Sequence, residues 1–466
     1  MSDQSEVGVI GSEASAAVPH EVGAHPVEVN YPSSMERRVL NLAWPVIGEN
    51  FLETLLGIVD TWLVSSLGAI ALAGVGTAIQ FMFFIISALS AISVGSAVLV
   101  AQSVGARDLV RAGNLAKQSL VWSLILSIPL GLIGLFNAHT LVGIFGMEPA
   151  VNEIGAAYLQ VTMGTVVVLV MLIIGGGVLR GAGDSRTPML VTALANVINV
   201  GLAYVLIFGK FGFPEMGAVG SAWATFIARL VALVLLLGAL WQGRNNVTIR
   251  GGASWWPDWS VARQLLKIGV PAAVEQMLMS LAFLVMTTVV SHLGTLTLAA
   301  QRVAMNAMSL SFLPGFGFSI AATALVGQSV GAKRPAEGQA AARIATRWAM
   351  IWMGCLAIIF LIFAPQIMGF FSDEPDVIAI GAAGLRMVAL TQPFWALGMV
   401  NGGALRGTGN TQFPLRVNAI GIWAAVGLGA FFVNYISPTL SAVWAAFLFT
   451  SPVTSFLLWR RFRKEI

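Results

Sequence analysis

The sequence contains an internal repeat, and its two copies are separated by a constant offset of 226 residues. Residues 99–106 (LVAQSVGA) return as 325–332 (LVGQSVGA), and residues 179–188 (LRGAGDSRTP) return as 405–414 (LRGTGNTQFP). A repeat of this length is far longer than the roughly 20–50 residues of a solenoid unit. It therefore predicts two homologous lobes with a site between them. Single residues that keep the same offset include Pro45 and Pro271, Glu49 and Glu275, and Leu67 and Leu293.

Long apolar runs with few charges place the chain in a membrane. Hydrophobic residues make up 57% of the sequence and charged residues only 10%, against about 25% charged in soluble domains. Many runs exceed the roughly 20 residues that a membrane-spanning helix needs. We predict an all-α polytopic membrane protein with twelve transmembrane helices. The expected spans are residues 38–66, 72–103, 110–137, 149–177, 187–209, 216–242, 263–290, 298–329, 337–363, 376–402, 412–436 and 438–460.

These spans form two sets of six, which predicts two lobes joined by a polar linker. Because six is even, both lobes start on the same side of the membrane, related by a pseudo-twofold axis along its normal, as in secondary transporters. The N-terminal segment holds five acidic residues, no basic residue and no apolar run, so it is neither a signal nor a transit peptide. The expected division is a disordered acidic tail (1–35), an N-lobe (36–242), a linker (243–262) and a C-lobe (263–466).

The positive charges predict the orientation of the chain. Most of the 25 Lys and Arg residues fall in loops on one side, together with the linker and the C-terminus. By the positive-inside rule, both termini are cytoplasmic in a multi-pass protein of the inner (plasma) membrane. The basicity is therefore explained by topology and by attraction to anionic lipid, and no nucleic-acid partner is expected.

The motifs that repeat also resemble a known family. Pro45 is followed by residues 57–61 (GIVDT), and Asn199 precedes residues 207–209 (IFG), alongside the paired QSVGA and LRGxG turns. In this order, over about residues 36–464, they resemble the multidrug and toxic compound extrusion (MATE) family. The resemblance implies two six-helix lobes around a V-shaped cavity. It also implies export of organic cations or other amphiphiles, driven by inward proton or sodium movement.

Three carboxylates in the first span predict an ion-coupling site. At about 100° per residue, Glu49, Glu53 and Asp60 fall on one stripe of the helix, which must face the protein because lipid would penalise buried charge. A carboxylate there can take up a proton or ligate a sodium ion. Asp60 matches the acidic residue that the resembling family uses for ion binding, and is the expected position of any Na⁺. Glu49 has a repeat partner in Glu275, so a structural role is the open alternative for Glu49.

Asn199 matches the asparagine that neighbours this carboxylate in the resembling family, although bonding to a neighbouring helix is the alternative. The chain departs from the family pattern at three positions. Ala203 replaces the aspartate of the archaeal-type proton-coupled branch. Residues 392–395 (QPFW) lack the acidic residue of the sodium-coupled branch, and Met279 replaces that branch's glutamate. The coupling ion is thus H⁺ or Na⁺, with H⁺ favoured because few hard oxygen ligands remain.

Other residues within the spans are candidates for the cavity. Arg229 pairs with a first-span carboxylate or serves a structural role, and Arg386 is a second intramembrane arginine with the same alternatives. Met and aromatic side chains suit an adaptable cavity, or are ordinary packing. The cavity candidates are Glu275, Arg229, Phe84, Met305, Phe394 and Trp395.

We therefore expect a secondary active antiporter that exports cationic or amphiphilic organic compounds in exchange for H⁺ or Na⁺ and functions as a monomer. The alternative is a lipid-linked oligosaccharide flippase of the wider superfamily, whose cavity would be strongly basic. An enzyme is not expected, because no metal-binding or nucleophile constellation emerges. No cofactor is expected either. ATP use would need a Gly-Lys-Ser/Thr sequence after a glycine-rich turn, and none follows the glycine-rich turns of this chain.

Overall fold

A computed structural model describes residues 32–243, 247–250 and 254–466, and every structural statement below concerns these parts. They form helices and no strand. Eleven helices are long and apolar enough to cross a membrane, and the bent pair α4–α5 supplies a twelfth span. The prediction of an all-α polytopic membrane protein is thereby confirmed. The helices are α1 (Pro32–Ser65), α2 (Ala69–Gly105), α3 (Leu109–Gly143), α4 (Pro149–Gly164), α5 (Val166–Gly181), α6 (Arg186–Phe208), α7 (Ala218–Gln242), α8 (Trp259–Ser291), α9 (Thr295–Gly331), α10 (Pro335–Phe371), α11 (Pro375–Thr408), α12 (Gln412–Tyr435) and α13 (Leu440–Glu465), with a short 3₁₀ helix at Lys210–Gly212.

The structure corrects the expected ends of the tail and of the linker. Helix α1 begins at Pro32, inside the segment expected to be a tail, and Met35 is buried. The rest of that segment, residues 1–31, lies outside the described residues. Helix α8 begins at Trp259, inside the expected linker, because Asp258 caps it by accepting from the Ser260 backbone N–H at 2.8 Å. These Ser260 hydrogen bonds also hold the pKa of Asp258 below its usual range.

The span predicted over 149–177 is two helices and not one. Thr165 has non-helical backbone angles, and α4 and α5 bend by 52° there. The Thr165 hydroxyl donates to the Val161 carbonyl oxygen at 2.8 Å, so the break keeps a local hydrogen bond. The repeat-equivalent stretch of the C-lobe stays within one continuous helix, α11. The break therefore distinguishes the two lobes.

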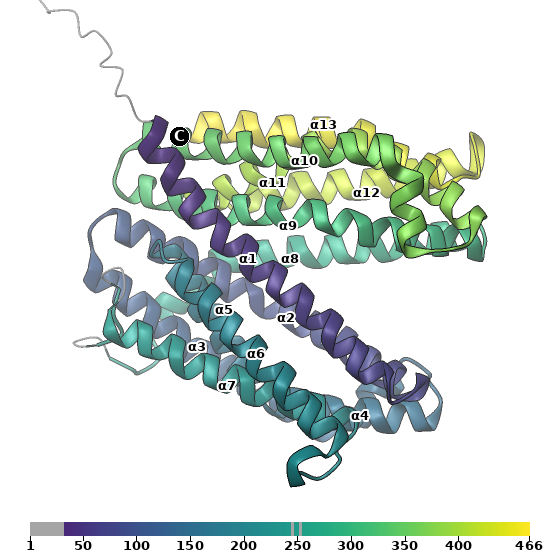
Figure 1. Cartoon of the computed structure of the whole chain (residues 1–466). Helices are drawn as coiled ribbons and strands as arrows, with labels where there is room; N and C mark the ends of the chain where they lie inside the picture. The colour runs from purple at the N-terminus through teal and green to yellow at the C-terminus, as the bar shows by residue number, and fades with distance from the viewer. Residues whose placement is uncertain (1–31, 244–246, 251–253) are drawn as a thin grey trace, which may run out of the picture.

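The helices gather in two groups, α2–α7 and α8–α13, with α1 running diagonally from the second group to the first (Figure 1). The first half of α1 is buried in the C-lobe, where Val39 and Ala43 pack with Phe318 of α9. The first half of α8 is buried in the N-lobe, where Leu265 packs with Val98 of α2. Each lobe's first helix thus crosses to the other lobe before returning to its own. Such an exchange couples the two bundles mechanically.

The two copies of each repeated turn meet at the end of the molecule that carries the C-terminus. The amide of Gln102 on α2 donates to the Gly407 carbonyl oxygen at 3.0 Å, and the amide of Gln328 on α9 donates to the Gly181 carbonyl oxygen at 3.0 Å. Each QSVGA turn therefore bonds to the LRGxG turn of the opposite lobe. The repetition of these motifs is explained by a symmetric closure of this end.

Glycine is required where α2 and α9 touch. A Cβ built on Gly105 would lie 1.9 Å from the Gln328 carbonyl oxygen, and one built on Gly331 would lie 1.9 Å from the Gln102 carbonyl oxygen. Both obstacles are backbone atoms, which cannot rotate away. The two lobes can close at this end only while both positions lack a side chain.

Gly105→Ala is therefore expected to separate the lobes at this end and to populate a conformation open there. Spin labels at the exposed Arg107 and Lys333, in a variant lacking Cys355, should report a distance longer by several ångströms. Gly57→Ala is the matched control, because a Cβ there meets nothing within 4 Å. An unchanged distance in Gly105→Ala would show that the closure tolerates a side chain.

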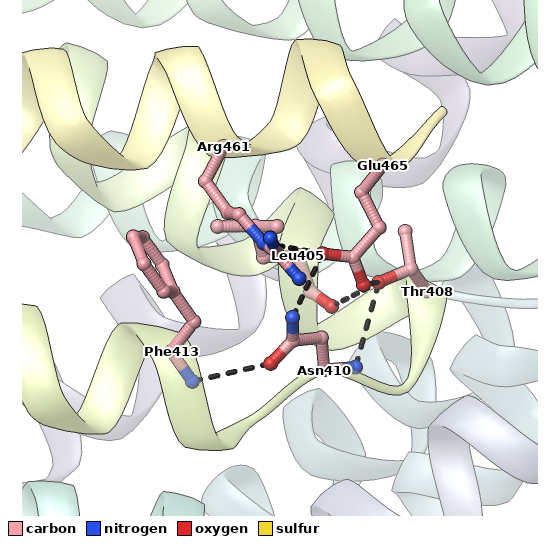
Figure 2. Close-up of polar contacts among 6 residues, drawn as sticks. All are labelled: Leu405, Thr408, Asn410, Phe413, Arg461 and Glu465. Atoms are coloured by element: carbon pink, nitrogen blue, oxygen red, sulfur yellow. Dashed lines mark hydrogen bonds and ion pairs between the residues drawn. The ribbon is translucent and has the colours of Figure 1, made fainter.

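The LRGxG turns also begin the helices that follow them. Asp184 accepts from the Thr187 backbone N–H at 3.0 Å, and its repeat partner Asn410 accepts from the Phe413 backbone N–H at 3.1 Å. In the C-lobe, the last turn of α13 reinforces this cap, since Asn410 donates to the Glu465 carboxylate at 2.7 Å (Figure 2). Side-chain caps of this kind satisfy the first free N–H groups of a helix. The C-terminal helix thus braces the turn that closes the lobes.

Candidate functional site

Two partly buried ion pairs occupy repeat-equivalent positions. The Arg180 guanidinium donates to Glu49 at 2.8 Å, and the Arg406 guanidinium donates to Glu275 at 2.7 Å. Both arginines belong to LRGxG turns, so each pair connects the first helix of a lobe to the LRGxG turn of the same lobe. Glu275 also accepts from the Asn418 amide at 2.7 Å. Both glutamates thus make the same contact between the first helix of their lobe and its LRGxG turn.

A polar cluster in the N-lobe has no such counterpart in the C-lobe. Asn199 on α6 is 1% exposed, and its amide donates to the Thr225 hydroxyl on α7 at 2.9 Å. One oxygen of Asp60 and the side-chain oxygen of Asn199 are buried without a hydrogen-bond donor among the described residues. The 226-residue offset pairs Asp60 with Met286 and Asn199 with Ala425. The carboxylate of Asp60 and the amide of Asn199 are therefore present in one lobe alone, whereas Thr225 has Ser451 at the same offset.

Apolar packing brings Asp60 toward this cluster. Val59 and Leu63, which flank Asp60 on α1, pack with Ala203, one turn after Asn199 on α6. Ala203 is fully buried, so its small side chain lets α1 approach α6 closely. The second half of α1, α6 and α7 form one seam, with the oxygens of Asp60 and Asn199 embedded in it.

Asp60 and Asn199 each hold a buried acceptor oxygen that no described donor satisfies. Burying a hydrogen-bond acceptor unsatisfied costs free energy, about 1–3 kcal/mol. A proton on Asp60 would supply a donor there, and a bound cation would supply a positive charge to its carboxylate. The Thr225 hydroxyl adds a third oxygen at this place. Asp60 is thus the candidate residue for binding a proton or another small cation.

Tyr158 and Arg229 complete the surroundings of Asp60. Tyr158 on α4 is 6% exposed, and the charge of Arg229 interacts electrostatically with Glu53 and Asp60. The structure forms no ion pair within 4.0 Å between Arg229 and either carboxylate among the residues it describes. Arg229 instead lines a small pocket beside the α4–α5 break at Thr165. The predicted pairing of Arg229 with a carboxylate is thus replaced by interaction at longer range.

Sequence reasoning did not single out Tyr158 and Thr225. Both are isolated polar groups inside apolar helices, which is a signal for intramembrane function or helix contact. Nothing in the sequence distinguishes Thr225 from Thr162 or Thr165 of the same lobe. Only the packing of α6 against α7 selects it, because that contact places Thr225 against Asn199.

The outer halves of α2 and α9 carry exposed residues. Near the closed end, Ala101 of α2 lies against Gly327 of α9. Five helical turns, about 18 residues, before Ala101 lies Phe83, which is 52% exposed. On α9 the same count from Gly327 leads to the exposed Ser309, and two turns further lies the exposed Arg302. The two helices therefore meet at one end and diverge toward the other, with Arg302 on the diverging face.

The remaining cavity candidates lie in the C-lobe or cannot be placed. Trp395 donates to the Ser451 hydroxyl at 2.8 Å and its ring packs against Phe312, so it serves helix packing. Met305 is partly buried against the C-lobe core, and Phe394 is 38% exposed. The side chain of Phe84 lies outside what the structure describes. The structure does not bring these residues to the N-lobe cluster.

Arg386 has a structural partner. Its Nε donates to the Leu361 carbonyl oxygen of α10 at 3.2 Å. That oxygen would normally accept from residue 365, which is Pro365 and has no N–H. Arg386 thus satisfies the carbonyl that the proline leaves free, beside the non-helical Phe363. This contact agrees with the structural alternative expected for Arg386.

Arg386→Met is accordingly expected to lower the free energy of unfolding by about 1 kcal/mol, through loss of this hydrogen bond. In a Pro365→Ala background the same substitution should cost much less, because an alanine at that position supplies the missing N–H. Denaturant unfolding of the four proteins in detergent measures the coupling between the two positions. Equal costs in both backgrounds would contradict the assigned role of Arg386.

The fold and these sites define a two-lobed polytopic membrane transporter. The MatE family model matches residues 45–205 and 271–436, which are the two repeats. The chain belongs to the MATE family, and it is a transporter and not an enzyme. The family resemblance seen in the motifs is thus confirmed.

Individual relatives agree with this assignment. The chain is 34% identical over 419 residues to a protein from Thermotoga maritima described as a probable multidrug resistance protein NorM, covering 88% of each. It is 25% identical to the multidrug resistance protein MdtK of Yersinia pestis, covering 92% of this chain and 95% of MdtK. A multidrug resistance MATE family transporter solved in its outward-facing conformation shares the fold, with a TM-score of 0.85, 24% identity and coverage of 92% and 96%. A transporter of the MOP superfamily from Pyrococcus furiosus gives a TM-score of 0.84 at 24% identity. The match covers 92% of this chain and 95% of that protein.

Proposed function

We propose that this transporter exports cationic or amphiphilic organic compounds in exchange for protons by alternating access. The observation that carries the proposal is the pair of buried acceptor oxygens on Asp60 and Asn199, in a lobe whose duplicate lacks both groups. The relatives described as multidrug resistance proteins support the class of exported compound. The protein acts in the inner (plasma) membrane, with both termini in the cytoplasm.

The proposed coupling follows from the position of Asp60 on α1. The first half of α1 is buried in the C-lobe and its second half in the N-lobe, so a change at Asp60 acts on a helix that both lobes hold. Binding of an ion shifts a conformational equilibrium only by the difference in its affinity for the two states. A proton that binds Asp60 more tightly in one state therefore favours that state.

Proton coupling is favoured over sodium coupling by the number of oxygens at the site. One carboxylate faces the seam between α1 and α6, and the position one turn after Asn199 is Ala203 instead of a second acid. A proton needs one acceptor oxygen, whereas a metal ion held in a protein needs several. Sodium remains the alternative that the experiment below distinguishes.

The diverging faces of α2 and α9 support an amphiphilic substrate. Exposed residues on these faces include Ile79, Phe83 and Leu310, together with Gln80 and Arg302. A flippase for a pyrophosphate-linked lipid would need several cations on this surface, and Arg302 is the single cation among the exposed residues of these two faces. Both lobes and both faces belong to one chain, so we propose that the monomer is the functional unit, with no nucleic-acid partner.

Everted vesicles that contain the purified protein test the coupling. Uptake of a fluorescent organic cation is measured with an acid interior and no sodium gradient, and separately with a sodium gradient and equal pH. The expected result is uptake that follows the pH gradient and stops when an ionophore dissipates it. Uptake with the sodium gradient alone would overturn the proton assignment, and no uptake under either gradient would overturn antiport.

A further inference from the structure

A cavity of about 620 Å³ lies between α10, α11 and α13 of the C-lobe. None of its lining residues belongs to the N-lobe cluster or to the diverging faces of α2 and α9. It lies near the end of the molecule at which α10 begins and the C-terminal helix α13 ends (Figure 1). The transport mechanism proposed above makes no use of it.

The cavity carries three positive charges and no acidic lining residue. Arg343 and Arg347 lie one turn apart on α10, and both are exposed. Arg463 reaches in from α13 and lies over the Trp459 ring at 5.0 Å from its centroid. Like charges one turn apart on a helix repel each other, so the proximity of Arg343 and Arg347 is unfavourable in free energy. An anion bound between the arginines would remove that repulsion.

Nearby acidic groups are already engaged elsewhere. Glu337 pairs with Arg334 at 2.9 Å and with Arg38 at 3.7 Å, and Glu465 pairs with Arg461 at 2.9 Å. No ion pair within the described parts of the chain involves the three arginines of the cavity. The positive charge is therefore available to an external ligand.

The lining becomes apolar further along α10. Met350 and Ile351, one turn beyond Arg347, are 39% and 44% exposed, and both line the cavity. Trp459 lies between the charged and apolar parts, as tryptophan does at the level of lipid headgroups. A ligand that fits this lining has an anionic head and an apolar chain.

We propose that this cavity binds the phosphate group of an anionic phospholipid, with an acyl chain along Met350 and Ile351. The recognised chemistry is a phosphate anion held by Arg343, Arg347 and Arg463. Basic pockets between transmembrane helices at the membrane surface bind such headgroups. A phospholipid is favoured over free phosphate because the apolar lining continues from the arginines.

The test measures lipid binding to the purified full-length protein by native mass spectrometry. Phosphatidylglycerol, phosphatidylcholine with the same acyl chains, and inorganic phosphate are titrated separately. Arg343→Gln/Arg347→Gln removes two of the three charges, and phosphatidylglycerol should bind roughly tenfold to thirtyfold more weakly to it than to the wild type. Arg460→Gln is the matched control, because Arg460 is an exposed cation of the same region that does not line the cavity.

Each outcome decides the proposal. Selective binding of phosphatidylglycerol to the wild type and to Arg460→Gln, with loss in the double variant, supports it. If the double variant does not fold, Arg463→Gln should show a loss of about fivefold. Equal binding of phosphatidylglycerol and phosphatidylcholine, or equal affinity in the wild type and the arginine variants, overturns the site. Displacement of phosphatidylglycerol by inorganic phosphate at comparable concentration overturns the assignment to a lipid.

Discussion

Replacing Asp60 by Asn is expected to reduce gradient-driven transport to the level of vesicles without protein. The substitution keeps the shape of the side chain but removes the group that binds and releases a proton. The protein should still fold, because Asp60 makes no ion pair among the described residues and one of its oxygens is buried without a donor. Gradient-driven uptake and thermal unfolding of the same preparation measure the two effects.

The control for Asp60 is Asp373→Asn, which makes the same chemical change at an exposed position between α10 and α11. It should leave transport unchanged. Substrate binding without a gradient should persist in Asp60→Asn, because the lost function is coupling. Wild-type uptake in Asp60→Asn would remove Asp60 from the coupling site, whereas unfolding of the variant would show that the carboxylate is structural.

Glu275→Ala is expected to have the largest effect on stability. Glu275 is 3% exposed and accepts from Arg406 and Asn418, both at 2.7 Å. Removing Glu275 leaves the partly exposed Arg406 and the Asn418 amide without their acceptor, which costs about 1–3 kcal/mol. The free energy of unfolding in detergent should fall by about this amount, and the yield of folded protein should fall with it.

A double-mutant cycle separates the ion pair from other contacts of Glu275. Glu275→Ala/Arg406→Met should cost less than the sum of the single substitutions, since neither charge remains unpaired. The pair of Arg334 and Glu337 is the contrasting case: Arg334 is 62% exposed, so Arg334→Met should cost about 0–1 kcal/mol. Additive costs at Glu275 and Arg406 would show that the pair contributes no coupling.

Because of the repeat, the same double-mutant cycle can be applied to Glu49 and Arg180. Sequence symmetry left coupling and structure as alternatives for this residue, and the structure places it against Arg180 just as Glu275 lies against Arg406. The symmetry was the informative signal, because a group that both lobes need belongs to their shared scaffold. Asp60 and Asn199, which lack partners at the 226-residue offset, are the ones that form the cluster unique to the N-lobe.

Some features of this cluster could not be predicted from the sequence. Helical spacing placed Glu49, Glu53 and Asp60 on one stripe of α1, but α1 passes from the C-lobe to the N-lobe along its length. Residues on one stripe therefore meet different neighbours. Glu49 reaches an arginine, Asp60 lies in an apolar seam, and Glu53 stays exposed.

The sequence by itself determined the number of spans, the duplication, the paired turns and the residues that break the symmetry. These follow from local chemistry, because apolar length specifies a span and an exact offset exposes a repeat. Tertiary structure alone decided that Thr225 and Tyr158 join Asp60 and Asn199, that α4 and α5 break at Thr165, and that Arg386 serves the carbonyl left free by Pro365. Those contacts depend on which faces of the helices meet, and apolar helices in a membrane carry little sequence information about their partners.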